Sequence, residues 1–211
     1  MTKSIRQTLY EKIMKELRKP SELDQFKKDA ASLTGVDTRD NTWRTNLDDY
    51  MSKYDFKKFG SGKYASVYGN QKYPFVIKVF QKDSAYMRWL KFCLSNRDNP
   101  YVPKIKGKVL KITPMVYAIR LEKLSPGYIT SEFNREYSQW QKDPNYKTQD
   151  AALQQVFDFF EPNRKLLDLH GENVMMRGDQ LVIIDPFYNW FGKEEPGKYT
   201  IDPDEIDPSL F

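Results

Sequence analysis

Cysteine and histidine are almost absent from this sequence: Cys93 is its one cysteine and His170 its one histidine. A single cysteine excludes an internal disulfide framework, so a reducing compartment is expected. A single histidine excludes His-rich metal sites. It also excludes a separate Ser/His/Asp or Cys/His catalytic set, unless His170 itself is the base.

Long apolar runs are missing as well. No segment approaches the roughly 20 consecutive apolar residues that a membrane-spanning helix needs. The N-terminal residues lack the apolar stretch of a secretory signal. We therefore expect a cytoplasmic protein without a membrane partner.

The composition is otherwise that of a folded protein. Of 211 residues, 39% are hydrophobic and 15% aromatic, which is enough to build a sizeable core. The net charge of +5 is compatible with a polyanionic ligand such as a nucleotide, RNA or an acidic protein face. The charge does not distinguish among these ligands. The length fits one domain with two lobes, or one domain with a helical extension.

The N-terminal part is predicted to be helical. Residues 1–19 carry apolar side chains at helical spacing, a second helix is expected to open at Ser21, and Asn46 is a candidate cap for a short helix over 47–51. We interpret residues 1–55 as a helical N-terminal extension.

From residue 56 the pattern changes to short strands, separated by Gly-containing turns, which predicts a β-meander over 56–59, 64–68 and 75–80. Asp83 or Ser84 is expected to cap the next helix. Cys93 lies on the apolar face of that helix and is predicted to be a core residue.

Two further strands are predicted over 104–111, where lysines alternate with other residues, and over 115–121. The second half is mainly helical, with Ser131 and Asp150 as helix caps, before a loop at 168–173 and a short buried strand at 181–184. This order predicts an α+β, two-lobed fold with an N-lobe at 56–124 and a reduced C-lobe at 125–211.

The first candidate for binding chemistry is the turn with Gly60, Ser61 and Gly62, followed by Ala65 and Val67. It matches the Gly-rich loop of kinases, with Ala65 at the third glycine. Glycines allow a strand–turn–strand segment to approach phosphates closely, so that backbone N–H groups face the phosphate oxygens. Taken alone, two glycines one residue apart are more often only a turn.

The second candidate is Lys78, which lies within the apolar strand at 75–80. Such a lysine can also face solvent. Its position one hairpin after the Gly-rich turn is what favours a contact with the α- and β-phosphates of ATP.

The third candidate is the set formed by Asp168, Asn173 and Asp185. An Asp five residues before an Asn, followed by an apolar hairpin that ends in a second Asp, is the catalytic and metal pattern of kinases. Asp168 would accept the proton of the attacking hydroxyl, and Asn173 and Asp185 would supply oxygen ligands to Mg²⁺. We expect His170, inside this loop, to order the loop rather than act as a base.

These motifs, together with the segments at 82–86 and 201–205, resemble the early serine/threonine protein kinases of the T-seven group of bacteriophages. The resemblance covers most of the chain from about residue 56. It implies a phage-encoded enzyme that uses ATP and Mg²⁺ to phosphorylate host proteins of the transcription or translation machinery, and itself, early in infection. No nucleic-acid partner is expected. The predicted nucleotide-binding residues are Gly60, Ser61, Gly62, Ala65, Val67, Lys78, Glu122 and Leu124.

The sequence departs from ordinary protein kinases at several positions. Leu166 and Leu167 stand where His-Arg usually precedes the catalytic Asp, and Asp185 is followed by Pro-Phe instead of Phe-Gly. Active kinases hold the strand lysine with a glutamate of the following helix. Between Lys78 and Leu121 the acidic residues are Asp83 and Asp98. We therefore expect Lys78 to be held by Asp185, by phosphates or by a polar group such as the Tyr86 hydroxyl.

Two alternative functions remain open. The Asp-x-His-x-x-Asn order at 168–173 also occurs in small-molecule kinases of the aminoglycoside-phosphotransferase type. The missing helix glutamate and the lysines at 104–111 would also suit a catalytically silent module that binds a host protein or RNA.

Overall fold

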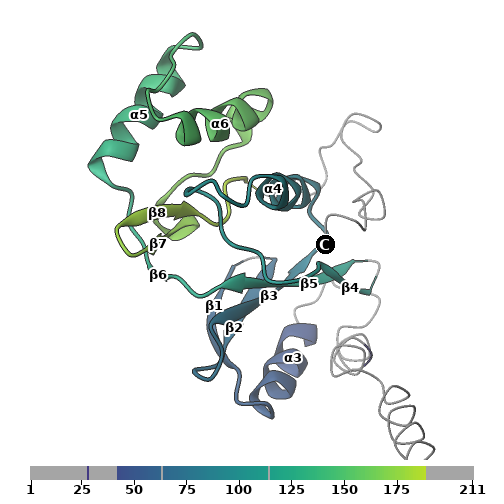
Figure 1. Cartoon of the computed structure of the whole chain (residues 1–211). Coiled ribbons are helices and arrows are strands. Elements are labelled where there is room, and N and C mark those ends of the chain that lie inside the picture. The colour runs from purple at the N-terminus through teal and green to yellow at the C-terminus, as the bar shows by residue number, and fades with distance from the viewer. Residues whose placement is uncertain (1–27, 29–41, 63, 114, 189–211) are drawn as a thin grey trace, which may run out of the picture.

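A computed structural model of the protein describes residue 28 and residues 42–62, 64–113 and 115–188 (Figure 1). The helices predicted within 1–19 and from Ser21 lie outside these residues, and so does the segment at 201–205. Within them the protein is a mixed α/β structure with two antiparallel sheets and several helices.

The larger sheet has five antiparallel strands in the order β1-β2-β3-β5-β4. Its strands are β1 (Lys57–Ser61), β2 (Ala65–Gly69), β3 (Phe75–Gln81), β4 (Leu110–Thr113) and β5 (Val116–Glu122). Strand β3 lies at the centre, because it pairs with β2 on one side and with β5 on the other. The predicted meander is confirmed, although β1 runs through Gly60 and Ser61, which the sequence had assigned to the turn.

Helices cover both faces of this sheet, and Figure 1 shows α3 (Thr42–Ser52) and α4 (Ser84–Ser95) on opposite sides of it. Leu47 and Met51 of α3 are buried against one face, together with Val79 of β3. Helix α4 packs on the other face, where Phe80 belongs to the same core cluster as Leu90. Successive strand residues therefore alternate between the α3 side and the α4 side.

The remaining elements lie on the α4 side of the sheet (Figure 1). A three-stranded sheet, β6-β7-β8, consists of β6 (Ser125–Pro126), β7 (Val174–Arg177) and β8 (Gln180–Ile183). The helical elements are α5 (Ser131–Lys142), α6 (Ala151–Phe160) and the two 3₁₀ helices η1 (Glu161–Leu166) and η2 (Gly171–Asn173).

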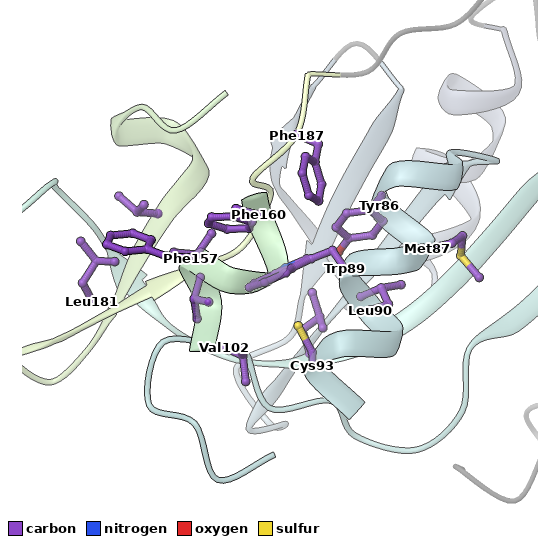
Figure 2. Close-up of a cluster of buried hydrophobic side chains, with 14 of the residues drawn as sticks. Tyr86, Met87, Trp89, Leu90, Cys93, Val102, Phe157, Phe160, Leu181 and Phe187 are labelled. Atoms are coloured by element: carbon purple, nitrogen blue, oxygen red, sulfur yellow. The ribbon is translucent and has the colours of Figure 1, made fainter. Parts of the chain in front are cut away.

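One hydrophobic cluster connects α4 with these elements, and Figure 2 shows part of it. Trp89 of α4 is fully buried, with its ring 5.7 Å from that of Phe160 on α6. Phe187, which follows β8, lies 5.7 Å from the ring of Phe160. Cys93 is buried in the same cluster, and burial raises the pKa of its thiol, so its predicted place in the core is confirmed.

Three local predictions need correction. The strand predicted over 104–111 begins only at Leu110. Gly107 has a φ of +85°, which β-structure does not allow, so a regular strand cannot run through it. Helix α3 begins at Thr42, so Asn46 lies inside the helix and is not its cap. Helix α5 is capped by Thr130 instead of Ser131, since the Thr130 hydroxyl accepts the N–H of Phe133 at 3.2 Å.

Candidate active site

Strand β3 directs Lys78 toward the α4 side of the large sheet. Its neighbours along the strand, Ile77 and Val79, belong to the cluster on the opposite face, and period-2 alternation turns Lys78 the other way. Only 7% of Lys78 is exposed. From the sequence alone, the Lys78 side chain could also have faced solvent. Its burial excludes that alternative.

Lys78 forms an ion pair with Asp185, with its Nζ atom 2.8 Å from Oδ2, although the two residues are 107 positions apart in the sequence. The ammonium group also lies over the ring of Tyr86, 3.7 Å from the ring centroid. Burial alone would lower the pKa of Lys78, but the neighbouring Asp185 and Tyr86 raise it well above its ordinary value. Lys78 is therefore a buried cation, and Asp185 is its carboxylate partner among the described residues.

The segment that carries Asp185 is fastened to the segment that carries Asp168. The backbone N–H of Asp168 donates to the Pro186 carbonyl at 2.8 Å, and that of Tyr188 donates to the Leu166 carbonyl at 2.8 Å. A β-bridge between Leu167 and Phe187 lies between these two bonds. These backbone contacts set the spacing of the two aspartates.

Asn173 and His170 order the loop between Asp168 and β7. The Asn173 Nδ2 atom donates to the Asp168 backbone carbonyl at 2.6 Å and lies 3.0 Å from Nε2 of His170. The Nδ1 atom of His170 accepts the N–H of Glu172 at 3.3 Å and so caps η2. The Nε2 atom of His170 is 3.6 Å from the Asp168 carboxylate. These contacts match the loop-ordering role expected for His170.

A cavity of about 280 Å³ brings six of the predicted site residues together: Gly62, Ala65, Lys78, Asp168, Asn173 and Asp185. The other residues that line it are Tyr64, Phe80, Gln81, Asp83, Tyr86, His170, Glu172, Phe187 and Tyr188. A larger cavity of about 560 Å³, between α5, α6 and β8, is lined by none of the predicted residues. The smaller one is the candidate active site, because the reactive groups converge there.

The Gly-rich turn closes above this cavity through a bond from the Gly62 N–H to the Ala65 carbonyl, at 3.0 Å. No atom of the described residues lies within 4 Å of the point where a side chain at Gly60 or Gly62 would begin. Apart from the chain neighbours of these glycines, no side chain of the described residues stands against this backbone, as the close approach of a phosphate requires.

Five predicted nucleotide-binding residues do not line the cavity: Gly60, Ser61, Val67, Glu122 and Leu124. The carboxylate of Glu122 is bound by Arg177, whose Nε donates to it at 3.0 Å and whose Nη2 pairs with its second oxygen. It also accepts the N–H of Lys104 at 2.6 Å. The Glu122 side chain thus connects β5 to β7 in this structure, and a contact of Glu122 or Leu124 with nucleotide stays a prediction.

The oxygen atoms of Asn173 and Asp185 suit a magnesium ion. Mg²⁺ prefers hard oxygen ligands, and proteins commonly hold it with one or two carboxylates together with substrate phosphates. Asn173 uses its amide nitrogen on Asp168, which leaves its amide oxygen for another ligand. Among the described residues there is no group of three or more His, Cys, Asp or Glu side chains that could hold a metal.

Sequence reasoning missed two polar residues of the cavity, Gln81 and Glu172. Glu172 lies between His170 and Asn173, and this position inside the motif is a signal that could have identified it. Gln81 ends β3 and is buried, and its three-residue distance from Lys78 gives no comparable signal because strand faces alternate.

In the part of the chain that the structure covers, none of the helices is long and apolar enough to cross a membrane.

Comparison with known proteins does not assign the chain to a family. No family model matches the chain, and no curated protein matches it. A crystal structure of Rad53 1-466 in complex with AMP-PNP is similar with a TM-score of 0.36 and 15% sequence identity. That match covers 72% of this chain and 44% of the Rad53 chain.

Proposed function

We propose that this chain is an ATP-dependent phosphotransferase with a protein-kinase-like fold. The observation that carries the proposal is the ion pair between Lys78 and Asp185, which lies in one cavity with Asp168, Asn173 and the Gly62 backbone. A buried cation for phosphates, oxygen ligands for a metal and a carboxylate for a proton are the groups that phosphoryl transfer requires.

Each group has a part in the reaction. The acceptor hydroxyl oxygen bonds to the γ-phosphorus while the bond from that phosphorus to the bridging oxygen breaks, and ADP leaves with the electron pair. Asp168 holds the acceptor hydroxyl and takes its proton. Lys78 holds the α- and β-phosphates. Mg²⁺, held by Asn173 and Asp185, would supply positive charge that offsets the charge of the phosphate oxygens.

We propose Ser and Thr side chains of proteins as the acceptors, including those of the chain itself. The resemblance to the phage kinases supports this substrate class, and it supports host transcription or translation proteins as partners in the bacterial cytoplasm. The proposed architecture is an α+β, two-lobed fold with a helical extension at 1–55, an N-lobe at 56–124 and a reduced C-lobe at 125–211.

A small-molecule phosphotransferase is the second candidate. The observation that favours it is the contact of His170 with both Asp168 and Asn173, since the Asp-x-His-x-x-Asn order is shared with kinases of that type.

Labelled ATP separates these candidates. The purified protein is incubated with Mg²⁺ and ATP carrying a labelled γ-phosphate, alone, with bacterial lysate proteins and with small hydroxyl compounds. Phosphoserine or phosphothreonine found by mass spectrometry supports the protein kinase, and transfer to small compounds alone supports the second candidate. Binding of a host protein without any transfer would indicate a catalytically silent module.

A further inference from the structure

The ring of Tyr86 occupies the side of Lys78 that faces α4. Tyr86 lies in the first turn of that helix and is 3% exposed. Its ring is met edge-on by Phe80, with the centroids 4.9 Å apart and the planes at 81°. The ammonium group of Lys78 lies 3.7 Å from the ring centroid. Ring and cation are therefore in direct contact in a buried environment.

Helix α4 carries no carboxylate side chain that contacts the Lys78 ammonium group. The acidic residues nearest to it are Asp83 and Asp98. The Asp83 carboxylate accepts the N–H groups of Ala85 and Tyr86 at 2.9 and 3.1 Å, and thus caps the helix. Asp98 is exposed and follows the end of the helix. The group of α4 that contacts Lys78 is an aromatic ring.

A ring face attracts a cation through its quadrupole, and the attraction is stronger where water is excluded. The ring carries no net charge, so it holds the ammonium group without competing with Asp185 or a phosphate as a counter-ion. The Tyr86 hydroxyl is buried and forms no hydrogen bond of normal length and angle with the described residues, although it lies close enough to Lys78 for an electrostatic interaction. The face of the ring is the part of Tyr86 in direct contact with the ammonium group.

The position of this ring is fixed by the packing of its helix. Trp89 and Phe92, further along α4, stack on each other with a centroid distance of 5.5 Å. Phe92 in turn stacks on Phe159 of α6 at 4.3 Å, and Trp89 lies against Phe160. Helix α4 is therefore held in place by α6.

We propose that Tyr86 is the positioning residue for Lys78: its ring holds the ammonium group where a nucleotide phosphate meets it, without a carboxylate from α4. This inference rests on the proposed function. Because the ring is neutral and α4 is packed against α6, the site needs no movement of α4 to align Lys78.

Two substitutions distinguish the effect of the Tyr86 ring from the effect of its hydroxyl. Tyr86→Phe keeps the ring, and we expect the KM for ATP to change less than about twofold. Tyr86→Leu removes the ring, and we expect that KM to rise about tenfold. In a Lys78→Met background, Tyr86→Leu should cause no further loss, because Tyr86 acts through Lys78. Leu94→Ala is the matched control, since it truncates a buried α4 residue at the other end of the helix and should lower stability while leaving this KM unchanged.

A second measurement does not depend on catalysis. A cation over a ring face experiences a ring-current shift, so the Lys78 side-chain resonance in lysine-labelled protein, assigned with Lys78→Arg, should lie upfield in the wild type and in Tyr86→Phe. It should return to the ordinary lysine position in Tyr86→Leu. Loss of the upfield shift in Tyr86→Phe, or a tenfold rise of KM in that variant, would overturn the inference. A wild type that transfers no phosphate overturns the proposed function, while the resonance and the nucleotide affinity by calorimetry still test Tyr86.

Discussion

Asp83 and Asp185 are two carboxylates near the same lysine, and they have different uses. Asp83 lines the cavity, but its oxygen is committed to the first N–H groups of α4. Burial raises the pKa of Asp83 above its ordinary value in spite of these bonds. Asp185 instead pairs directly with Lys78. Of the two candidate caps, Asp83 and Ser84, the structure shows Asp83. Of the partners that the sequence offered for Lys78, it shows Asp185.

Asp168→Asn should abolish phosphoryl transfer and leave nucleotide affinity nearly unchanged. The variant removes the proton acceptor, and the Asp168 backbone carbonyl still binds Asn173. Loss of a general base costs on the order of 10²–10⁴ in rate. Labelled-ATP transfer and calorimetry measure the two quantities, with Asp179→Asn on the exposed turn before β8 as the control. Full activity in Asp168→Asn would mean that the catalytic loop is assigned wrongly.

Asp185→Asn should remove the Mg²⁺-dependent part of nucleotide affinity. It also leaves the buried Lys78 cation without its carboxylate, which we expect to cost about 2 kcal/mol of stability. Adding Lys78→Met should restore much of the stability and none of the affinity. Denaturant unfolding and calorimetry with and without Mg²⁺ are the measurements. Equal affinity of wild type and Asp185→Asn in Mg²⁺ would contradict the metal role.

Helices α4, α5 and α6 begin at side-chain caps that the chain supplies locally. Asp83 caps α4, and Asp150 caps α6 by accepting the N–H groups of Ala152 and Leu153. Each cap satisfies backbone donors that have no partner within the helix. Such caps also fix where each apolar helix face starts, and so which residues reach the shared core.

Asp150→Ala should lower the free energy of unfolding by about 1 kcal/mol, the usual contribution of an N-cap. Denaturant unfolding monitored by circular dichroism measures the change. Asp98→Ala, at an exposed position outside a helix, is the control and should change stability little. If the two variants were equally stable, the cap would contribute nothing.

Strands β5 and β7 belong to different sheets, and the Glu122–Arg177 pair joins them. Burial alone would raise the pKa of Glu122, but hydrogen bonds from Arg177 and from the Lys104 N–H lower it below the ordinary value of 4.5. Arg177 also donates to the backbone carbonyls of Pro100 and Val102. The pair therefore connects three segments of the chain.

Glu122→Gln should cost about 2 kcal/mol, as expected for hydrogen bonds to a charged group. Because the folded pKa lies below the unfolded one, the contribution of Glu122 is complete above pH 4.5 and is lost as the pH falls through the folded pKa. The stability difference between wild type and Glu122→Gln should therefore shrink with acid. Unfolding curves between pH 6 and 3 (about the range that glutamates titrate) test this, and a difference independent of pH would contradict it.

The two sheets share one hydrophobic cluster, and α4 lies within it. Trp89 contacts rings on α6, while other α4 residues of the cluster pack with Phe80, Tyr117 and Ile119 of the large sheet. A core of this kind couples the unfolding of both parts.

Trp89→Leu should lower stability by about 3 kcal/mol, because a large buried ring is lost and a cavity remains. Unfolding should stay a single transition, with circular dichroism and tryptophan fluorescence coinciding. Met87→Leu, which nearly conserves volume, is the matched control and should cost less than about 1.5 kcal/mol. Two separate transitions in either variant would show that the sheets unfold independently.

Local patterns were sufficient for much of this fold. Strand alternation, the caps at Asp83 and Asp150 and the burial of Cys93 follow from neighbours within a few residues, so the sequence predicted them. Irregular backbone, and the choice between two adjacent residues that can each cap a helix, were harder to predict from the sequence. Gly107 interrupts a strand that the lysine alternation favours, and Thr130 and Ser131 are both suitable caps whose choice depends on the path of the preceding chain.

The description of the candidate site required both the sequence and the tertiary structure. Motif order along the chain identified Lys78, Asp168, Asn173 and Asp185 without any knowledge of distances, because each residue type has a definite chemistry. Only the tertiary structure decided that the Lys78 ammonium lies between the Asp185 carboxylate and the Tyr86 ring, and that Arg177 binds the Glu122 side chain. The Lys78–Asp185 and Glu122–Arg177 contacts join residues 107 and 55 positions apart in the sequence. The contact between Lys78 and Tyr86 is closer in sequence, but it depends on how α4 packs between the large sheet and α6, which local spacing does not encode.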